Sequence, residues 1–484
     1  MRRIRKPAIH PLMLFSLVRY LRYGLQMVRA IIIAKHLGPY YLGVWGFVTL
    51  VLQYLSYTTF GIENGITVLL STADEEKEEI QNKYTSASVL SIFLVSLLTL
   101  SAGIMINWSG VELFPKFEFN QYLKLILVVT ISANILQVLT NILRVKRALF
   151  KIAIVEIITA AILLTIALLV RTEKVILAQL WGMIISNLLG IAIFLVRFPY
   201  KFSLKASKEV FMALARISFP LFIYNLSFYL IMVSPRTILS FYYSLEEVGH
   251  YTLANSIAMA ALLGFRSIAW AIYPEVLSRL RTGVSIQAAR KSINQINQLF
   301  STAVFLTIFF CILLLPLFVI YLQQYRQAVP TITVLLLAQG ILAVSFGYNA
   351  LAVSRERQKD VAQIGILAIV VVTIISLLVS LLKFDYLFIS FAVLAGAFLY
   401  TYFNIRLGLN ILEIKENRGR EYGELLSTET LFSIGIFSVG IFSEYSLWFN
   451  LTGLVVFFVS NWQRINSTGK FLRSKIGLVS VERE

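Results

Sequence analysis

Three arginines lie inside a stretch that is otherwise apolar enough to cross a membrane. The stretch is residues 15–38, FSLVRYLRYGLQMVRAIIIAKHLG, and it contains Arg19, Arg22 and Arg29. Together with Gln26 they are spaced by three, four and three residues, which places them on one helical face. An arginine at the bilayer centre costs about 2.5–3.5 kcal/mol, so this face must point toward protein or a water-filled cavity. A guanidinium group can donate two parallel hydrogen bonds to a carboxylate or phosphate group, so a cavity lined by arginines would suit an anionic ligand.

The arginines need not all reach the cavity. Arg19 and Arg29 lie toward the two ends of the predicted helix, where long side chains can extend to the membrane surface, and only Arg22 is central. In the second half of the chain, Arg266 lies near the middle of an apolar run and would face the cavity or form a buried ion pair. Arg236 follows a proline near a helix end. Its side chain could form part of a gate, contact the ligand or extend to the membrane surface.

Two carboxylates also enter apolar runs. Glu63 lies between Gly61 and Gly65, at about the depth of Arg22. It would either pair with Arg22 as a structural partner or carry a coupling proton, because burial favours the protonated carboxyl. Glu156, two turns into its helix, is expected to stabilise the start of that helix.

The composition bounds the class of protein. The chain has 484 residues, of which 58% are hydrophobic and 14% charged, and its mean hydropathy is +0.79. These values indicate an all-α, multi-pass membrane protein. A single cysteine, Cys311, and three scattered histidines argue against disulfides and metal sites. No nucleotide-binding loop occurs, so neither a cofactor nor ATP-driven transport is expected.

Apolar runs of sufficient length predict about fourteen membrane helices. They fall near 12–36, 40–71, 85–106, 121–143, 150–170, 175–196, 209–241, 248–278, 293–321, 328–353, 361–382, 384–405, 430–443 and 446–462. Lysine and arginine are concentrated in alternate connections, which places those connections and both termini in the cytoplasm. The net charge of +18 is therefore explained by the orientation of the protein in the membrane and by contact with anionic lipid headgroups, and no nucleic acid is expected as a partner.

An internal repeat organises these helices. Asn141, Leu143, Val145, Arg147 and Lys151 recur as Asn349, Leu351, Val353, Arg355 and Lys359, an offset of 208 residues. Leu42-Gly43 likewise matches Val248-Gly249 at an offset of 206. The offset spans six helices, so the repeats would be parallel and enclose a central cavity. The predicted parts are two six-helix lobes, 1–208 and 209–410, a linker with two extra helices, 411–463, and a cytoplasmic tail, 464–484.

Several motifs resemble those of bacterial oligosaccharide flippases. They are AKHLGPYYLG at 34–43, FGIEN at 60–64, YPEVLSRL at 273–280 and the basic turns near 144–151 and 355–359. The resemblance covers essentially the whole chain. These flippases form the polysaccharide-transport branch of the superfamily that also contains multidrug exporters and the lipid II flippase.

The resemblance implies a V-shaped cavity and the outward movement of undecaprenyl-pyrophosphate-linked glycans, such as O-antigen or capsule precursors, across a bacterial inner membrane. The pyrophosphate would bind Arg22, Arg29, Arg266 and Arg19, and Asn225 and Asn255 are candidates for glycan hydrogen bonds. A polysaccharide polymerase is an implied partner. A lipid II exporter stays open because its substrate shares the pyrophosphate, whereas drug exporters favour acidic cavities. A membrane-embedded glycan polymerase or ligase is disfavoured by the short outer loops.

Overall fold

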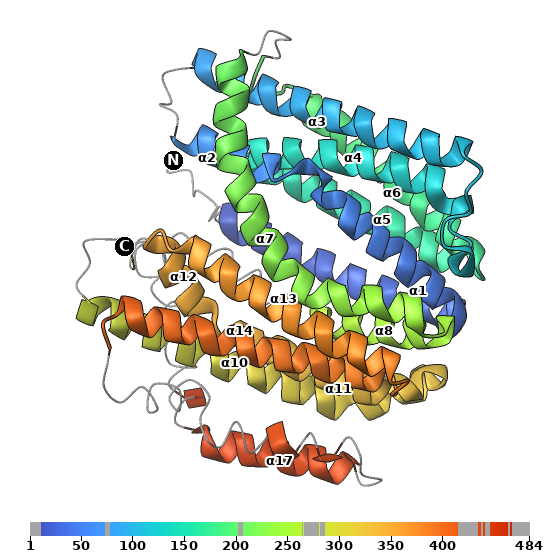
Figure 1. Cartoon of the computed structure of the whole chain (residues 1–484), viewed down its shortest axis with the longest axis vertical. Coiled ribbons are helices and arrows are strands. Elements are labelled where there is room, and N and C mark those ends of the chain that lie inside the picture. The colour runs from blue at the N-terminus through green and yellow to red at the C-terminus, as the bar shows by residue number, and fades with distance from the viewer. Residues whose placement is uncertain are drawn as a thin grey trace, which may run out of the picture. The chain divides into compact units, whose positions relative to one another are not determined.

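The computed structural model describes residues 11–72, 78–201, 207–263, 265, 280, 286–414, 434–436, 439–440, 446–462 and 465–466. The described residues form helices joined by turns and short loops (Figure 1). Eight of their helices are long and apolar enough to cross a membrane, among them α3, α4, α5 and α6 in the first half. The chain is thus a multi-pass membrane protein built from helices, as its composition predicts.

The chain divides into two compact units. The first comprises residues 1–226 with 244–249, and the second comprises 227–243 with 250–484. The division falls inside a helix and not at residue 208, where the sequence places the end of the first lobe. The lobes themselves stay a prediction.

The described residues of the first unit form seven helices, one of them shared with the second unit, and two 3₁₀ turns. They are α1 (Pro11–Ser56), η1 (Tyr57–Thr59), α2 (Ile62–Thr72), α3 (Glu78–Trp108), η2 (Pro115–Phe117), α4 (Asn120–Val145), α5 (Leu149–Leu169), α6 (Lys174–Leu195) and the first part of α7 (Lys208–Tyr242). In this unit α1 packs on α5, while α4 packs on α6 and on α2. Ile66 of α2 and Ile142 of α4 are completely buried in the core that α2, α3 and α4 share.

Two interruptions in this unit follow from glycines. Gly38 has φ 66° and separates α1 into two helices, and Pro39 begins the second of them. The predicted helices 12–36 and 40–71 are therefore confirmed as separate at this point. The second predicted helix is itself broken, because Phe60 and Gly61 take left-handed backbone angles between η1 and α2. A Cβ atom at Gly61 would lie 2.7 Å from the carbonyl oxygen of Ser218, so close contact with α7 also requires glycine here.

The other helices that the structure describes belong to the second unit. They are the last part of α7, α8 (Leu245–Ala261) after its first turn, α10 (Ile286–Tyr321), η3 (Gln323–Ala328), α11 (Val329–Val344), α12 (Phe346–Ser354), α13 (Gln358–Leu381), α14 (Leu387–Ile411) and α17 (Ser446–Ser460). In this unit α11 and α13 pack on α14, and α17 packs on α10. The predicted helix 328–353 is interrupted at Ser345, and the predicted helix 430–443 lies mostly outside the described residues.

Helix bounds in the two halves of the chain correspond. The pair α11 and α12 begins and ends 209 residues after α4, and α13 begins 209 residues after α5. The turn that follows is also the same, because the Ala148 N–H donates to Leu143 O and the Arg357 N–H donates to Ala352 O, at 3.0 and 2.8 Å. This correspondence is one residue longer than the sequence match, so Arg147 occupies the place of Glu356 and not that of Arg355. The bounds support the predicted repeat.

Candidate functional site

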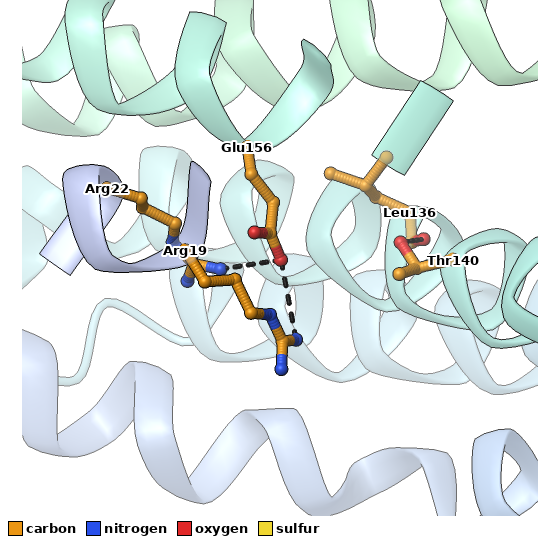
Figure 2. Close-up of polar contacts among 5 residues, drawn as sticks. All are labelled: Arg19, Arg22, Leu136, Thr140 and Glu156. Atoms are coloured by element: carbon orange, nitrogen blue, oxygen red, sulfur yellow. Dashed lines mark hydrogen bonds and ion pairs between the residues drawn. The ribbon is translucent and has the colours of Figure 1, made fainter. Parts of the chain in front are cut away.

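The arginines of α1 converge on a carboxylate of α5. Arg22 Nη1 lies 2.8 Å and Arg19 Nη2 lies 3.5 Å from the same oxygen, Oε1 of Glu156 (Figure 2). The side chains of Arg19, Arg22 and Glu156 are 20%, 28% and 13% exposed. This geometry follows from the spacing of the two arginines, one helical turn apart on the face of α1 that meets α5.

The predicted Arg22–Glu63 pair is wrong, because Arg22 pairs with Glu156. Glu156 also pairs with Arg19, and the expectation that it stabilises the start of α5 stays a prediction. Glu63 is buried on α2, where its Oε1 accepts a hydrogen bond of 3.2 Å from Asn64, while its Oε2 is buried without a hydrogen bond. Similar depth along two helices therefore does not bring their side chains together, because the faces that meet are those of α1 and α5.

A further arginine from α4 enlarges the cationic region. Arg144 lies within electrostatic range of Arg19, and its Nη2 is 3.5 Å from the hydroxyl oxygen of Thr67 on α2. The nearby hydroxyl of Thr140 on α4 donates to the carbonyl oxygen of Leu136 at 2.7 Å and is thereby engaged within its own helix (Figure 2). The sequence does not indicate Arg144 as a site residue, because Arg144 lies among the basic residues of a turn that is predicted to be cytoplasmic.

Arg29 differs from the other arginines of α1. Its Nε is buried without a hydrogen bond, and in the described part of the chain no carboxylate pairs with it. Arg22 is close enough to Arg29 for their charges to repel. Arg19, Arg22, Arg29 and Arg144 thus bring four positive charges, whereas Glu156 brings one negative charge. We call these four arginines and Glu156 the cationic face; it has an excess of positive charge that an anion could neutralise.

The predicted residues of the second half are only partly brought together. Arg236 is 4% exposed on α7 and lies within electrostatic range of Tyr251 of α8, whose hydroxyl is buried without a hydrogen bond. Asn255, one turn further along α8, donates to the sulfur of Met259 at 3.6 Å, and its Oδ1 is buried without a hydrogen bond. Asn225 is half-buried on α7, in the first unit. Arg266 lies outside the described residues.

Comparisons with known proteins agree with this architecture. Residues 12–281 match the polysaccharide biosynthesis protein family, Polysacc_synt, whereas a comparison with curated protein sequences gives no match. The fold is similar to that of the lipid II flippase MurJ in an inward closed conformation, with a TM-score of 0.67 and 14% identity over 96% of this chain and 100% of that one.

It is also similar to an inward-facing multidrug resistance MATE family transporter of the MOP superfamily, with a TM-score of 0.66 and 13% identity over 83% of this chain and 99% of that one. An outward-facing MATE structure gives 0.60 and 12% over 84% and 97%. Both likenesses concern the fold, whereas the family match covers more than half of the sequence. The chain therefore belongs to the polysaccharide biosynthesis protein family.

Proposed function

We propose that this protein moves an undecaprenyl-pyrophosphate-linked oligosaccharide from the inner to the outer leaflet of a bacterial inner membrane. The observation that carries the proposal is the cationic face of α1, in which Arg29 has no carboxylate partner in the described residues. A cation held at membrane depth costs about 2.5–3.5 kcal/mol, and charged residues at this depth usually serve a function. A pyrophosphate supplies several acceptor oxygens in the geometry that guanidinium groups match.

The charge of the face discriminates among substrates of the superfamily. Four arginines against one paired carboxylate disfavour a cationic drug, because like charges at this depth repel strongly in a low dielectric. Lipid II also carries a pyrophosphate, so charge alone does not separate it from an oligosaccharide precursor. The family match to polysaccharide biosynthesis favours the oligosaccharide.

The transport mechanism in this proposal is alternating access by two parallel six-helix lobes. The corresponding bounds of α4 and α11–α12, and of α5 and α13, support the repeat. Rocking of the lobes would expose a cavity that includes Arg22, Arg29, Arg19 and Arg266 first to one leaflet and then to the other. Both termini would lie in the cytoplasm, and Arg236, Asn225 and Asn255 would contact the glycan or a gate.

The test is flipping in proteoliposomes that contain a fluorescent polyprenyl-pyrophosphate oligosaccharide, measured as the fraction that becomes accessible to a membrane-impermeant quencher. Arg29→Ala should lower the rate by on the order of tenfold or more, because a charge-assisted contact to the ligand contributes about 1.5–3 kcal/mol. Arg29→Lys should retain part of the rate, since lysine keeps a point charge without the paired hydrogen bonds.

The matched control is Arg171→Ala, which removes an exposed arginine after the end of α5. Its rate should equal that of the wild type. Wild-type protein that flips lipid II but no oligosaccharide precursor would replace the proposed substrate. Normal flipping by Arg29→Ala would show that the cationic face does not bind the substrate.

A further inference from the structure

Two glycines on different helices meet backbone to backbone. Gly43 lies in the second half of α1, and Gly249 lies in the first turns of α8. A Cβ atom at Gly43 would overlap the carbonyl oxygen of Leu245 and lie 3.3 Å from the Gly249 nitrogen. A Cβ atom at Gly249 would overlap the carbonyl oxygen of Pro39 and lie 3.1 Å from the Gly43 nitrogen. No side chain larger than hydrogen fits at either position without moving a backbone.

The contact is reciprocal and follows the internal repeat. Gly43 and Gly249 are 206 residues apart, and so are the two overlapped residues, Pro39 and Leu245. Each glycine therefore meets the carbonyl oxygen that lies one turn before the other glycine. Such pairs allow two helices to approach until Cα hydrogens contact carbonyl oxygens, which stabilises the pair weakly and only at one geometry.

The second part of α1 and the helix α8 both begin near this contact. α1 resumes after the left-handed Gly38, and α8 starts at Leu245. Two positive helix ends thus lie together, an arrangement that costs energy unless anionic groups offset it. In α8 the cap is a Ser-x-x-Glu box: the N–H and Oγ of Ser244 each donate to Oε2 of Glu247 at 2.8 Å, and the Glu247 N–H donates to Ser244 Oγ at 3.3 Å. Lys116 of η2 also interacts electrostatically with Glu247.

The first turn of α8 is separable from the rest of that helix by its packing. Residues 244–249 belong to the first unit, whereas the helix from His250 onward belongs to the second. The first turn is fixed by the glycine contact, by its buried Leu245 and Val248 side chains and by the charge of Lys116. The first turn of α8 is therefore held by contacts of its own within the first unit, distinct from the packing of the rest of the helix.

We propose that the Gly43–Gly249 contact is the outer closure of the transporter, which separates to release substrate and reforms on return. This inference rests on the proposed function, since the predicted topology places the starts of both helices at the outer surface. Where the two glycines meet, only backbone atoms touch, so this part of the contact separates without rearranging side-chain rotamers. The contact also forms in only one register of the two helices. If one helix shifts along the other, each carbonyl oxygen no longer faces a glycine and the two backbones cannot approach as closely.

The first experiment links the two helix starts. Tyr40 and Glu246 are both exposed and are equivalent in the repeat, each following one of the contacted carbonyl residues. In a Cys311→Ser background, Tyr40→Cys with Glu246→Cys should react with short bifunctional thiosulfonates. Flipping should fall at least roughly tenfold in the linked protein and return after reduction, since a linked closure cannot populate the open state. Each single cysteine treated with a monofunctional reagent is the control.

The second experiment prevents closure. Gly43→Ala and Gly249→Ala each place a methyl group against a carbonyl oxygen, so the linking yield of the 40/246 pair should fall on the order of tenfold. Gly24→Ala is the matched control, because a Cβ atom at Gly24 of α1 meets no heavy atom within 4 Å. Its linking yield should equal that of wild type.

The outcomes separate this inference from the proposed function. The linking yield requires no substrate, so the closure is tested even in a protein that flips no oligosaccharide. Failure of the 40/246 pair to link in the parent protein, an unchanged yield in both glycine variants, or normal flipping while linked would each overturn the closure. Wild-type protein that links as expected but flips no pyrophosphate-linked glycan would overturn the substrate alone.

Discussion

Replacing Glu156 by glutamine should destabilise the protein through the two arginines that it leaves behind. Glu156 Oε1 is the shared partner of Arg22 at 2.8 Å and Arg19 at 3.5 Å. Removing one member of a buried ion pair costs about 3–5 kcal/mol, because the remaining charge stays buried. The arginines keep 20% and 28% of their side-chain surface exposed, so water screens them in part and we expect the lower end, about 3 kcal/mol.

The assay is thermal unfolding of purified protein in detergent, compared with wild type at the same protein and detergent concentration. A loss of this size should lower the unfolding midpoint by roughly 3 °C, because the unfolding entropy grows with chain length. Glu79→Gln is the control, because Glu79 also pairs with a cation, Lys83 at 2.7 Å, but its side chain is 81% exposed. That variant should unfold at the wild-type midpoint, since water replaces the lost partner of an exposed pair.

A double variant separates stability from transport. Arg22→Met with Glu156→Met removes both charges of the closer pair and should recover part of the stability that Glu156→Met loses, because apolar replacement of both partners is close to neutral whereas Arg19 still lacks its partner. Flipping should stay low, since the guanidinium of Arg22 is absent. A Glu156→Gln protein as stable as wild type would refute the ion-pair account. A double variant with normal flipping would refute the role of Arg22 in binding.

Three other changes test separate parts of the account. Glu63→Gln should fold normally, because the Glu63 carboxylate contacts Asn64 and not an arginine. If this variant loses the response of flipping to a pH gradient in proteoliposomes, Glu63 is a proton site. A retained response would exclude that role. Asn297→Leu should lower stability by about 1–3 kcal/mol in denaturant titrations, since the fully buried Asn297 Oδ1 accepts the Gly347 N–H at 3.1 Å beside the Ser345 interruption. Cysteines introduced into the 411–428 segment should react only from the cytoplasmic side, and labelling from outside would contradict the predicted topology.

The helices and their ends could be predicted because they depend on local chemistry. Apolar runs of about 20 residues give α4, α5 and α6 to within a few residues. Gly38 followed by Pro39 indicates the break in α1, since glycine tolerates the left-handed region and proline suits the first helical position. The interruption at Ser345 has no such signal, because the surrounding sequence continues the apolar helical pattern.

The partner of Arg22 could not be predicted from depth alone. Counting residues from a helix end gives height in the membrane, but it does not give which helix packs against which face. Glu63 and Glu156 both lie at a depth in the membrane that Arg22 could reach, and only the packing of α1 on α5 selects Glu156 as its partner. Arg29 could be found from sequence because the spacing within one helix fixes the face that it shares with Arg22.

The division between paired and unpaired arginines bears on how transport is driven in the proposed mechanism. Glu156 neutralises one charge among Arg19 and Arg22, so the cationic face without ligand keeps net positive charge. An inside-negative potential contributes about 2.3 kcal/mol per charge per 100 mV to moving a charge across the full membrane. That field favours the outward movement of an anionic substrate and the inward return of the empty cationic face. Fully pairing the arginines would remove the second of these effects, whereas Arg29, which pairs with no carboxylate among the described residues, preserves it. Flipping by the wild type should therefore accelerate under an imposed inside-negative potential, and Arg29→Ala should weaken that acceleration. The potential is imposed on the proteoliposomes with potassium gradients and valinomycin. An equal response of both proteins would refute the argument.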